Sequence, residues 1–426
     1  MEGVDTIVIG SPVYWHNLCV SVRNVLDRFY GWVEKGALAG RRLFFVFQGA
    51  GPEKWMLEAG EYTMKRFAFL YGMTWMGMAT SRQEAATLGK EVEHAVLYTG
   101  QRPDRIRRGP WLHGMSHAYG APADTKEMTE LLARAVDMGY TFFDTAEVYG
   151  TPEDPHANEA LVGAALKPFR SRVVIATKFG IRFDTSSPAA NKPLLPDSRP
   201  EIIRAAVEAS LRRLHTDHID LYYQHRQDPR VPVEDVAGVM QQLMREGKIT
   251  HWGLSEVTED TLCRAHAVCP VTAVQNRYSM MARWYENLFP VLEELGIGYV
   301  AFSPLANGFL SGRYDKTSRF DSQTDYRSVM PQFQPESIDR NQALLSLLNN
   351  LAGDMGAPPA QISLAWMLCR KPYLVPIPGT RRPERLRENA EAADIALSAE
   401  DISAIDRALD GMDMSPVFGG TPVAKA

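Results

Sequence analysis

Short apolar runs alternate with stretches of helical periodicity along most of this chain. Between residues 125 and 138, apolar side chains recur three and four positions apart, which is typical of an amphipathic helix. The following apolar run ends abruptly at Asp144, which indicates a short buried strand. The same criteria predict helices at 158–166, 199–214, 233–246, 258–268, 284–295, 359–369 and 382–392. They predict strands at 172–177, 219–223, 250–254, 272–274, 298–302 and 374–377.

Strands and helices that alternate in this way are typical of βαβ units and a parallel sheet. Seven such strands predict an α/β fold of the (β/α)8 TIM-barrel type over residues 114–426. The place of the first strand, 111–115, follows Arg107, Arg108 and Pro110, which suit a central strand poorly. We therefore expect either a degraded first strand or a barrel that is open at one edge.

The first hundred residues form a separate pattern. Strands are predicted at 5–10, 42–47 and 74–79, with helices between them at 19–30 and 56–71. This order predicts a doubly wound parallel sheet over residues 1–99. Residues 100–113 are basic and rich in proline and glycine, which indicates a linker.

The motifs Gly10-Ser-Pro-Val-Tyr-Trp15 and Asn24-Val-Leu-Asp-Arg28 resemble the flavodoxin-like NAD(P)H-dependent flavin reductases over about residues 3–95. The resemblance implies that the aromatic loop packs on the flavin ring of FMN. The chain lacks the earlier strand and the phosphate-binding loop of that family, so the strand at 7–9 is expected to be an open sheet edge. FMN is therefore the less favoured cofactor, and a partial domain that packs or pairs with something is the preferred interpretation.

Composition limits the possible partners and compartments. The 426 residues carry a net charge of −5, which gives no reason to expect nucleic acid or an anionic membrane as partner. The apolar runs are too short to span a bilayer, and the N-terminus is unlike a signal peptide. The four cysteines form no pair with metal-ligand spacing, so we expect reduced thiols, no metal site and a cytoplasmic protein. The sequence carries no signal of oligomeric state.

The predicted barrel strands end, one after another, in polar residues. Each of these side chains alone would be ordinary capping, whereas together they lie on the face where such barrels hold their active sites. They are Asp144, Lys178, His225, Ser255, Asn276 and Ser303.

Three of these polar residues, together with a nearby tyrosine, suit proton donation to a carbonyl oxygen. Tyr149 supplies a phenolic proton; tyrosine hydroxyls in water titrate near about pH 10, and a nearby lysine ammonium favours the ionised form. Lys178 supplies that ammonium, Asp144 holds the lysine, and His225 orients the carbonyl. The set suits delivery of a hydride to a carbonyl carbon with protonation of its oxygen.

Six ordered motifs are similar to those of the aldo-keto reductases over about residues 114–412. They are Asp144-Thr-Ala-Glu-Val-Tyr149-Gly, Ala176-Thr-Lys178-Phe-Gly, Asp220-Leu-Tyr-Tyr-Gln-His225, Gly253-Leu-Ser255-Glu, Phe302-Ser-Pro-Leu305 and Ile377-Pro-Gly-Thr380. The resemblance implies NADPH bound without a dinucleotide fingerprint, and Asp144, Tyr149, Lys178 and His225 as a catalytic tetrad. It implies that Ser255, Gln275 and Asn276 hold the nicotinamide carboxamide and that Tyr278 stacks on the ring.

The resemblance also implies two further groups of cofactor residues. The pyrophosphate would be lined by Ser303, Leu305, Gly308, Leu310, Gly312 and Arg313. The adenosine end would be held by Gly379, Thr380, Arg381, Arg385, Glu388 and Asn389. Two guanidinium groups beside a threonine hydroxyl suit a 2′-phosphate, which favours NADPH over NADH. The alternative for these arginines is ordinary solvated helix charge.

Two functions are compatible with these patterns. The first is an NADPH-dependent oxidoreductase that reduces small aldehydes and ketones, with the loop at 314–340 shaping the substrate site. The second is a non-catalytic NADP(H)-binding barrel subunit or interaction protein with a vestigial flavodoxin-like domain, motivated by the poor first strand. The two partial domains are joined at a poor linker, which also suggests that the chain comes from a rearranged or mis-joined reading frame.

Overall fold

The computed structural model divides the chain into two compact units, Met1–Asp104 and Arg105–Ala426. It describes residues 6–14, 17–18, 42–48, 61, 63–69, 73–79, 95–99, 123–188, 192–322 and 325–417.

The second unit is built on a seven-stranded parallel sheet, which confirms the α/β class and its strand order. The strands pair in the order β14-β13-β12-β11-β10-β7-β6, so neighbours in sequence are neighbours in space. Their bounds are β6 (Phe142–Asp144), β7 (Val174–Phe179), β10 (Ile219–Gln224), β11 (Ile249–Ser255), β12 (Ala273–Arg277), β13 (Gly298–Phe302) and β14 (Leu374–Pro376). The sheet curls as a barrel wall does, with β6 and β14 at its two ends. The predicted strand at 111–115 lies outside the described residues.

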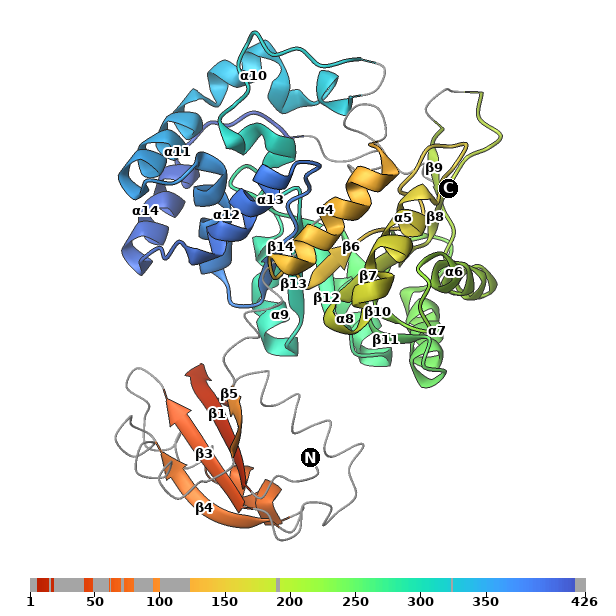
Figure 1. Ribbon diagram of the computed structural model, residues 1–426, viewed down its shortest axis with the longest axis vertical. Coiled ribbons are helices and arrows are strands. Elements are labelled where there is room, and N and C mark those ends of the chain that lie inside the picture. The colour runs from red at the N-terminus through yellow and green to blue at the C-terminus, as the bar shows by residue number, and fades with distance from the viewer. Residues whose placement is uncertain are drawn as a thin grey trace. The chain divides into compact units, whose positions relative to one another are not determined.

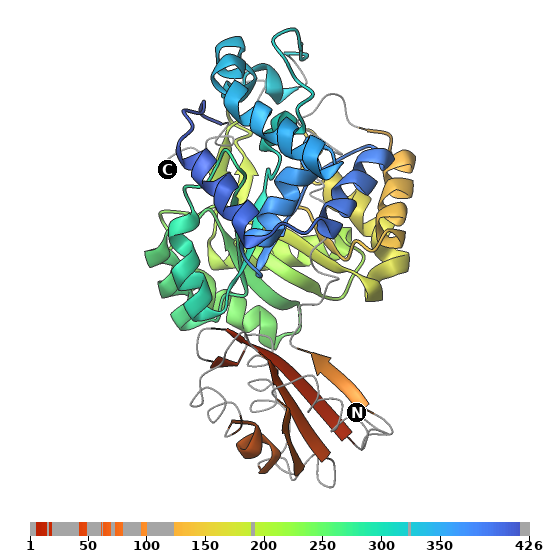
Figure 2. The same cartoon turned by 90° about the vertical axis from the view of Figure 1, so that its left-hand side faces the viewer.

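Helices cover the outside of this sheet, and the strands run side by side within them (Figures 1 and 2). The α-helices are α4 (Thr125–Asp137), α5 (Ala157–Leu166), α6 (Pro200–Arg213), α7 (Val233–Arg245), α8 (Glu259–Val268), α9 (Phe289–Leu295), α10 (Pro335–Arg340), α11 (Gln342–Met355), α12 (Pro359–Arg370), α13 (Pro383–Glu391) and α14 (Ala399–Asp410). A short antiparallel hairpin, β8 (Ile181–Phe183) and β9 (Leu194–Pro196), follows β7. The sequence pattern did not predict this hairpin, nor α10, α11 and α14.

Side-chain alternation along the strands produces two layers of core. The interior cluster contains apolar residues from β6, β7, β10, β12 and β13 and one residue directly after β14: Phe142, Ala176, Leu221, Tyr223, Ala273, Val300, Phe302 and Ile377. The intervening residues, such as Phe143, Tyr222 and Trp252, belong to the larger cluster between sheet and helices. Because successive strand residues point to opposite faces, each side chain near a strand end is committed to one of these layers.

The predicted helix at 284–295 is wrong in its first half. Residues Glu286–Leu288 form a 3₁₀ turn, and the α-helix begins only at Phe289. Pro290 lies in the first turn of α9, where a missing backbone N–H costs nothing, whereas further along a helix it would remove a hydrogen bond.

The first unit contains a sheet with β1 (Thr6–Tyr14), β3 (Arg42–Gln48), β4 (Thr74–Ala79) and β5 (Ala95–Thr99) in parallel, and β2 (Asn17–Leu18) antiparallel to the end of β1. The expectation of an open edge at 7–9 is wrong, because β1 pairs with β3 on one side and with β5 on the other. Strand β5 was not predicted. Residues 61 and 63–69 are helical, within the predicted helix at 56–71, and the predicted helix at 19–30 lies outside the described residues.

Candidate active site

An ion pair between β6 and β7 lies at the centre of the site. Lys178 and Asp144 are almost fully buried, and the Lys178 ammonium is 2.5 Å from Oδ1 of Asp144. The ammonium also donates to the carbonyl oxygen of Thr145 at 2.8 Å. Burial raises the pKa of Asp144, and the charge and hydrogen bond of Lys178 oppose that rise. The two charges compensate each other where neither could remain alone.

Tyr149 and His225 complete the four predicted catalytic residues around this pair. The Lys178 ammonium is 4.9 Å from the centre of the Tyr149 ring. The His225 ring meets that of Tyr149 edge-on, with centroids 5.6 Å apart and planes at 80°. Both rings are buried, at 6% and 7% exposure. The structure therefore brings together side chains from the ends of three adjacent strands, β6, β7 and β10.

The loop after β6 holds Tyr149 through its own backbone and through α5. The Thr145 hydroxyl donates to Oδ1 of Asn158 at 2.7 Å, and the Asn158 N–H donates to the Tyr149 carbonyl at 3.1 Å. Gly150 permits the return of the chain, because a Cβ there would lie 2.0 Å from the Asp154 carbonyl oxygen. The tyrosine is thus fixed on both sides of its own position.

The second oxygen of Asp144 has a different partner. Nε2 of Gln275, from β12 on the far side of the interior, donates to Oδ2 of Asp144 at 2.7 Å. Tyr223 lies in the interior cluster, and its position is possible because the residue opposite it in β11 is Gly253. A Cβ on Gly253 would lie 2.4 Å from Cε1 of Tyr223.

A second carboxylate, Glu147, lies in the loop that carries Tyr149. Its Oε1 accepts from the Gly180 N–H at 3.0 Å, and its own N–H donates to the Lys178 carbonyl at 3.2 Å. Burial, together with the negative charge of Glu159, raises the pKa of Glu147 to about 8. Glu159 is fully buried and accepts hydrogen bonds from Thr177 and Arg213, so the Arg213 guanidinium compensates its negative charge.

Two predicted ligands of the nicotinamide carboxamide lie close to β11. Ser255 is the last residue of β11 and is buried, with its hydroxyl 3.4 Å from an Arg226 guanidinium nitrogen. Asn276 is fully buried, and its Oδ1 accepts from the Glu256 N–H at 2.7 Å. Nδ2 of Asn276 has no hydrogen-bond partner among the described residues, so one polar atom remains for a ligand.

The loop after β13 is unusual in its backbone. Ser303, Ala306 and Asn307 have positive φ angles of 52°, 47° and 62°, and Gly308 follows at 99°. Non-glycine residues rarely adopt this conformation, and such strain gathers at functional sites. Successive backbone N–H groups in left-handed turns also form concavities that bind anions. The Ser303 hydroxyl is buried and has no partner among the described residues. The loop therefore has a backbone of the kind that binds anions, with one donor, the Ser303 hydroxyl, unpaired within the described ranges.

Comparison with known proteins identifies the family. Residues 109–410 match the model of the aldo/keto reductase family. The chain belongs to the aldo/keto reductase family. It is 39% identical over 309 residues to a probable aldo-keto reductase 1 of Glycine max, covering 72% of this chain and 85% of the relative.

Two solved structures have the same fold. The glycerol dehydrogenase AKR11B4 of Gluconobacter oxydans is 27% identical with a TM-score of 0.66, over 74% of this chain and 94% of that one. An aldo/keto reductase of Klebsiella pneumoniae, solved in complex with NADP and acetate, is 27% identical with a TM-score of 0.54, over 73% and 95% of the two chains.

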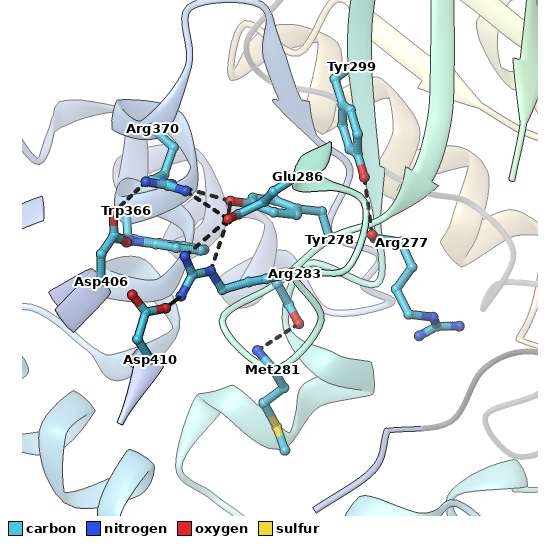
Figure 3. A network of polar contacts seen from close by, with 11 residues as sticks. Arg277, Tyr278, Met281, Arg283, Glu286, Tyr299, Trp366, Arg370, Asp406 and Asp410 are labelled. Carbon is cyan, nitrogen blue, oxygen red and sulfur yellow. Dashed lines mark hydrogen bonds and ion pairs between the residues drawn. The ribbon is translucent and has the colours of Figure 1, made fainter. Parts of the chain in front are cut away.

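One predicted cofactor residue of this aldo/keto reductase is misplaced. Tyr278 is fully buried in the outer core, where its ring stacks on Trp366 with centroids 5.6 Å apart. Its hydroxyl donates to Glu286 at 2.6 Å within an ion network that Arg283 and Arg370 complete (Figure 3). The faces and hydroxyl of Tyr278 are thus occupied on the helix side of the sheet. The prediction that Tyr278 stacks on the nicotinamide is wrong.

Two interior residues near the strand ends were not predicted from the sequence. Phe302, the last residue of β13, belongs to the interior cluster and directly precedes Ser303. The Arg277 guanidinium lies over the Phe302 ring, 4.9 Å from its centre, and its side chain diverges from that of Tyr278 in Figure 3. Strict alternation along β12 and β13 was the signal that could have found both residues.

The remaining predicted cofactor residues are spread over two segments. Leu310 is fully buried in the outer core, so its side chain cannot line a pyrophosphate. Leu305 is half-buried, Gly312 has a φ of 68°, and the Arg313 side chain is exposed. Arg385 forms an ion pair with Glu388, and Arg313 is 4.0 Å from the same carboxylate. Gly379, Thr380, Arg381 and Asn389 are at least partly exposed on and beside α13.

The predicted substrate loop is folded on its own aromatic core. Phe309, Tyr314, Phe320 and Phe333 contact one another edge-on or tilted, with centroids between 5.1 and 5.7 Å apart. The Arg327 guanidinium lies over Tyr314 and Phe320, and Asp325 bonds the same guanidinium. Short 3₁₀ turns at Tyr326–Ser328 and Pro331–Phe333 lead into α10. This packing gives the loop a defined shape.

Two absences concern the described part of the chain only. Its ranges hold no group of three or more His, Cys, Asp or Glu side chains that could bind a metal ion. None of the helices in these ranges is long and apolar enough to cross a membrane.

Proposed function

We propose that this aldo/keto reductase reduces the carbonyl group of small aldehydes and ketones with NADPH. The observation that carries the proposal is the buried Asp144–Lys178 pair beside Tyr149 and His225. NADPH, when bound, supplies the hydride. Named relatives are themselves aldo-keto reductases, and one was solved with NADP.

The four residues divide the proton transfer between them. Tyr149 donates its phenolic proton to the carbonyl oxygen as negative charge develops there. The Lys178 ammonium favours the phenolate that remains, and Asp144 fixes the position of that ammonium. His225, packed edge-on against Tyr149, orients the carbonyl oxygen. General acid catalysis of this kind contributes roughly 10²- to 10⁴-fold in rate.

The residues that would hold the cofactor form a path from the tetrad to α13. Phe302 takes the stacking role in place of Tyr278, and Ser255 with Nδ2 of Asn276 faces the carboxamide. The strained loop at 303–308 holds the pyrophosphate with Gly312 and Arg313. The adenosine end is taken by Gly379, Thr380, Arg381, Arg385, Glu388 and Asn389.

The preference for NADPH over NADH rests on Arg385. In this structure Glu388 occupies its guanidinium, and a 2′-phosphate dianion would compete for it with two charge-assisted bonds. We expect Arg385→Leu to weaken NADPH binding about tenfold or more and to leave NADH binding within about twofold. Fluorescence titration of both nucleotides measures this, with Arg387→Leu as a control on the exposed side of the same helix. Equal losses for the two nucleotides would contradict the assignment.

The finer assignments belong to the same proposal. The second unit is of the (β/α)8 TIM type, with its first strand still a prediction, and the first unit is a partial flavodoxin-like sheet, supported by its parallel pairing. The domain limits are 1–99, 100–113 and 114–426. A cytoplasmic location is supported by free thiols at Cys263, Cys269 and Cys369.

A further inference from the structure

Gln275 was predicted to hold the nicotinamide, and its side chain also contacts Asp144 of the proposed catalytic tetrad. The two Asp144 oxygens each have one side-chain donor, Lys178 on Oδ1 and Gln275 on Oδ2. A carboxylate only accepts hydrogen bonds, so the amide nitrogen of Gln275 must be the atom that faces it. Asp144 is fully buried, and its second oxygen therefore depends on Gln275 for compensation.

Tyr223 is a third interior residue that interacts with Asp144. Its side chain is fully buried in the interior cluster, and its position in β10 pairs with Lys178 of β7. Burial, followed by the charge of Asp144, raises the pKa of Tyr223, so the phenol stays neutral beside the carboxylate. Water has little room to replace a lost donor in such a packed interior.

We propose that Gln275 is a positioning residue of the reaction: it holds the free oxygen of Asp144 from across the barrel and thereby keeps Lys178 placed against Tyr149. The proposal rests on the tetrad assignment above and goes beyond a role in holding the nicotinamide. A pure carboxamide ligand would affect nucleotide affinity. A residue that holds Asp144 affects the charge state of that carboxyl and hence the pH range of turnover.

The groups that face Asp144 are few and come from four strands. They are Lys178 of β7, Gln275 of β12 and Tyr223 of β10, with Asp144 itself at the end of β6. When the Gln275 donor is removed, burial is opposed by Lys178 alone, and Asp144 takes up a proton at higher pH. A protonated Asp144 holds the ammonium less firmly, so turnover declines below that higher pH.

The test is the pH profile of kcat/KM for a simple aldehyde with NADPH, measured on the full chain. Gln275→Leu removes the amide donor, and we expect the low-pH limb to move upward by about one pH unit. At the low-pH end of the profile, kcat of the variant should be at least tenfold below that of wild type. The dissociation constant for NADPH should stay within about threefold of the wild-type value. Gln275→Glu keeps the side-chain volume and places a second carboxyl against Asp144, and it should move the limb further.

Two matched variants separate this effect from loss of packing. Gln224→Leu makes the same substitution at the end of β10, where the amide donates to the Ser198 hydroxyl at 2.9 Å. Tyr222→Phe removes a fully buried tyrosine hydroxyl at the neighbouring position of β10, in the outer core. In both control variants, the low-pH limb of kcat/KM should lie at the same pH as in wild type.

The outcomes decide between the roles. Weakened NADPH binding with an unchanged pH profile in both Gln275 variants would overturn the proposal and leave a carboxamide ligand. If the wild type reduces the aldehyde and the Gln275 variants give that result, the proposed function stands and only the role of Gln275 is wrong. If the wild type reduces no carbonyl substrate, the proposed function itself is wrong.

Discussion

Asp144 and Glu147 are three residues apart and carry out different tasks. Asp144 points into the barrel, where Lys178 and Gln275 satisfy both of its oxygens. Glu147 points between the loops after β6 and β7 and accepts from the Gly180 N–H, without a lysine or arginine within ion-pair distance in the described ranges. Lys178 and Gln275 favour the ionised form of the first carboxylate against its burial, whereas the second is pushed toward its neutral form.

The raised pKa of Glu147 predicts a pH-dependent stability. Its folded pKa of about 8 exceeds the ordinary value of 4.5, so the folded state binds the proton more tightly. That contribution to stability is complete below pH 4.5 and is lost as the pH rises toward 8. Each pKa unit is worth about 1.4 kcal/mol, and the partial exposure of the Glu147 side chain limits the total to a few kcal/mol.

Glu147→Gln should therefore stabilise the protein at pH 9 and leave it almost unchanged at pH 5, because the amide still accepts from Gly180. Urea unfolding of wild type and variant at the two pH values measures the difference. The exposed Glu130 of α4 provides a control, and Glu130→Gln should give the same small effect at both. A Glu147→Gln difference that is equal at the two pH values would contradict the titration.

The four residues proposed as catalytic were predictable from the sequence, and the residue proposed to stack on the nicotinamide was not. Asp144, Lys178 and His225 each follow a recognisable buried strand, so their convergence followed from parallel strands alone. Tyr278 lies one residue beyond β12, where the chain has already turned toward the helices. The contact between Gln275 and Asp144 joins residues 131 positions apart, and no local pattern encodes it.

Helix packing around the barrel depends on single glycines. Gly163 of α5 faces the end of α6, and a Cβ there would lie 2.2 Å from the Arg213 carbonyl oxygen and 2.5 Å from Cα of Leu214. Gly238 of α7 has no atom within 4 Å of the same position. Both glycines are inside helices, where alanine is ordinarily favoured by about 1 kcal/mol.

The two glycines should therefore respond oppositely to the same substitution. We expect Gly163→Ala to destabilise by roughly 1–3 kcal/mol, because backbone atoms of α6 must move. Gly238→Ala should stabilise by about 0.5–1 kcal/mol through helix propensity. Denaturant unfolding of the two variants measures both. A stabilised Gly163→Ala would show that α5 and α6 are not packed as described.

Helices and strands of the second unit followed largely from their hydrophobic periods. The hairpin β8–β9 was not predicted because each of its strands is only three residues long. Helix α14 was not predicted because the predicted pattern stopped before its capping box at Ser398 and Asp401. In the first unit, strand β5 was missed, and with it the second neighbour of β1. Long-range pairing decided these features, and short apolar segments do not specify it.

At the scale of the whole molecule, the reductase chemistry belongs to one of two compact units. The tetrad and the predicted cofactor residues all lie within Arg105–Ala426, and the family match covers residues 109–410. The parallel sheet of the first unit supplies none of the residues to which we assign a role in reduction. Carbonyl reduction is therefore an activity of the second unit in this account.

The most direct test of that account is the Tyr149→Phe variant of the full chain. The substitution keeps the ring against His225 and Lys178 and removes only the proton donor. We expect NADPH-dependent reduction of a simple aldehyde to fall by about 100-fold or more, while NADPH quenches the protein fluorescence as in wild type. Turnover close to wild type in Tyr149→Phe, with NADPH bound, would contradict the central claim.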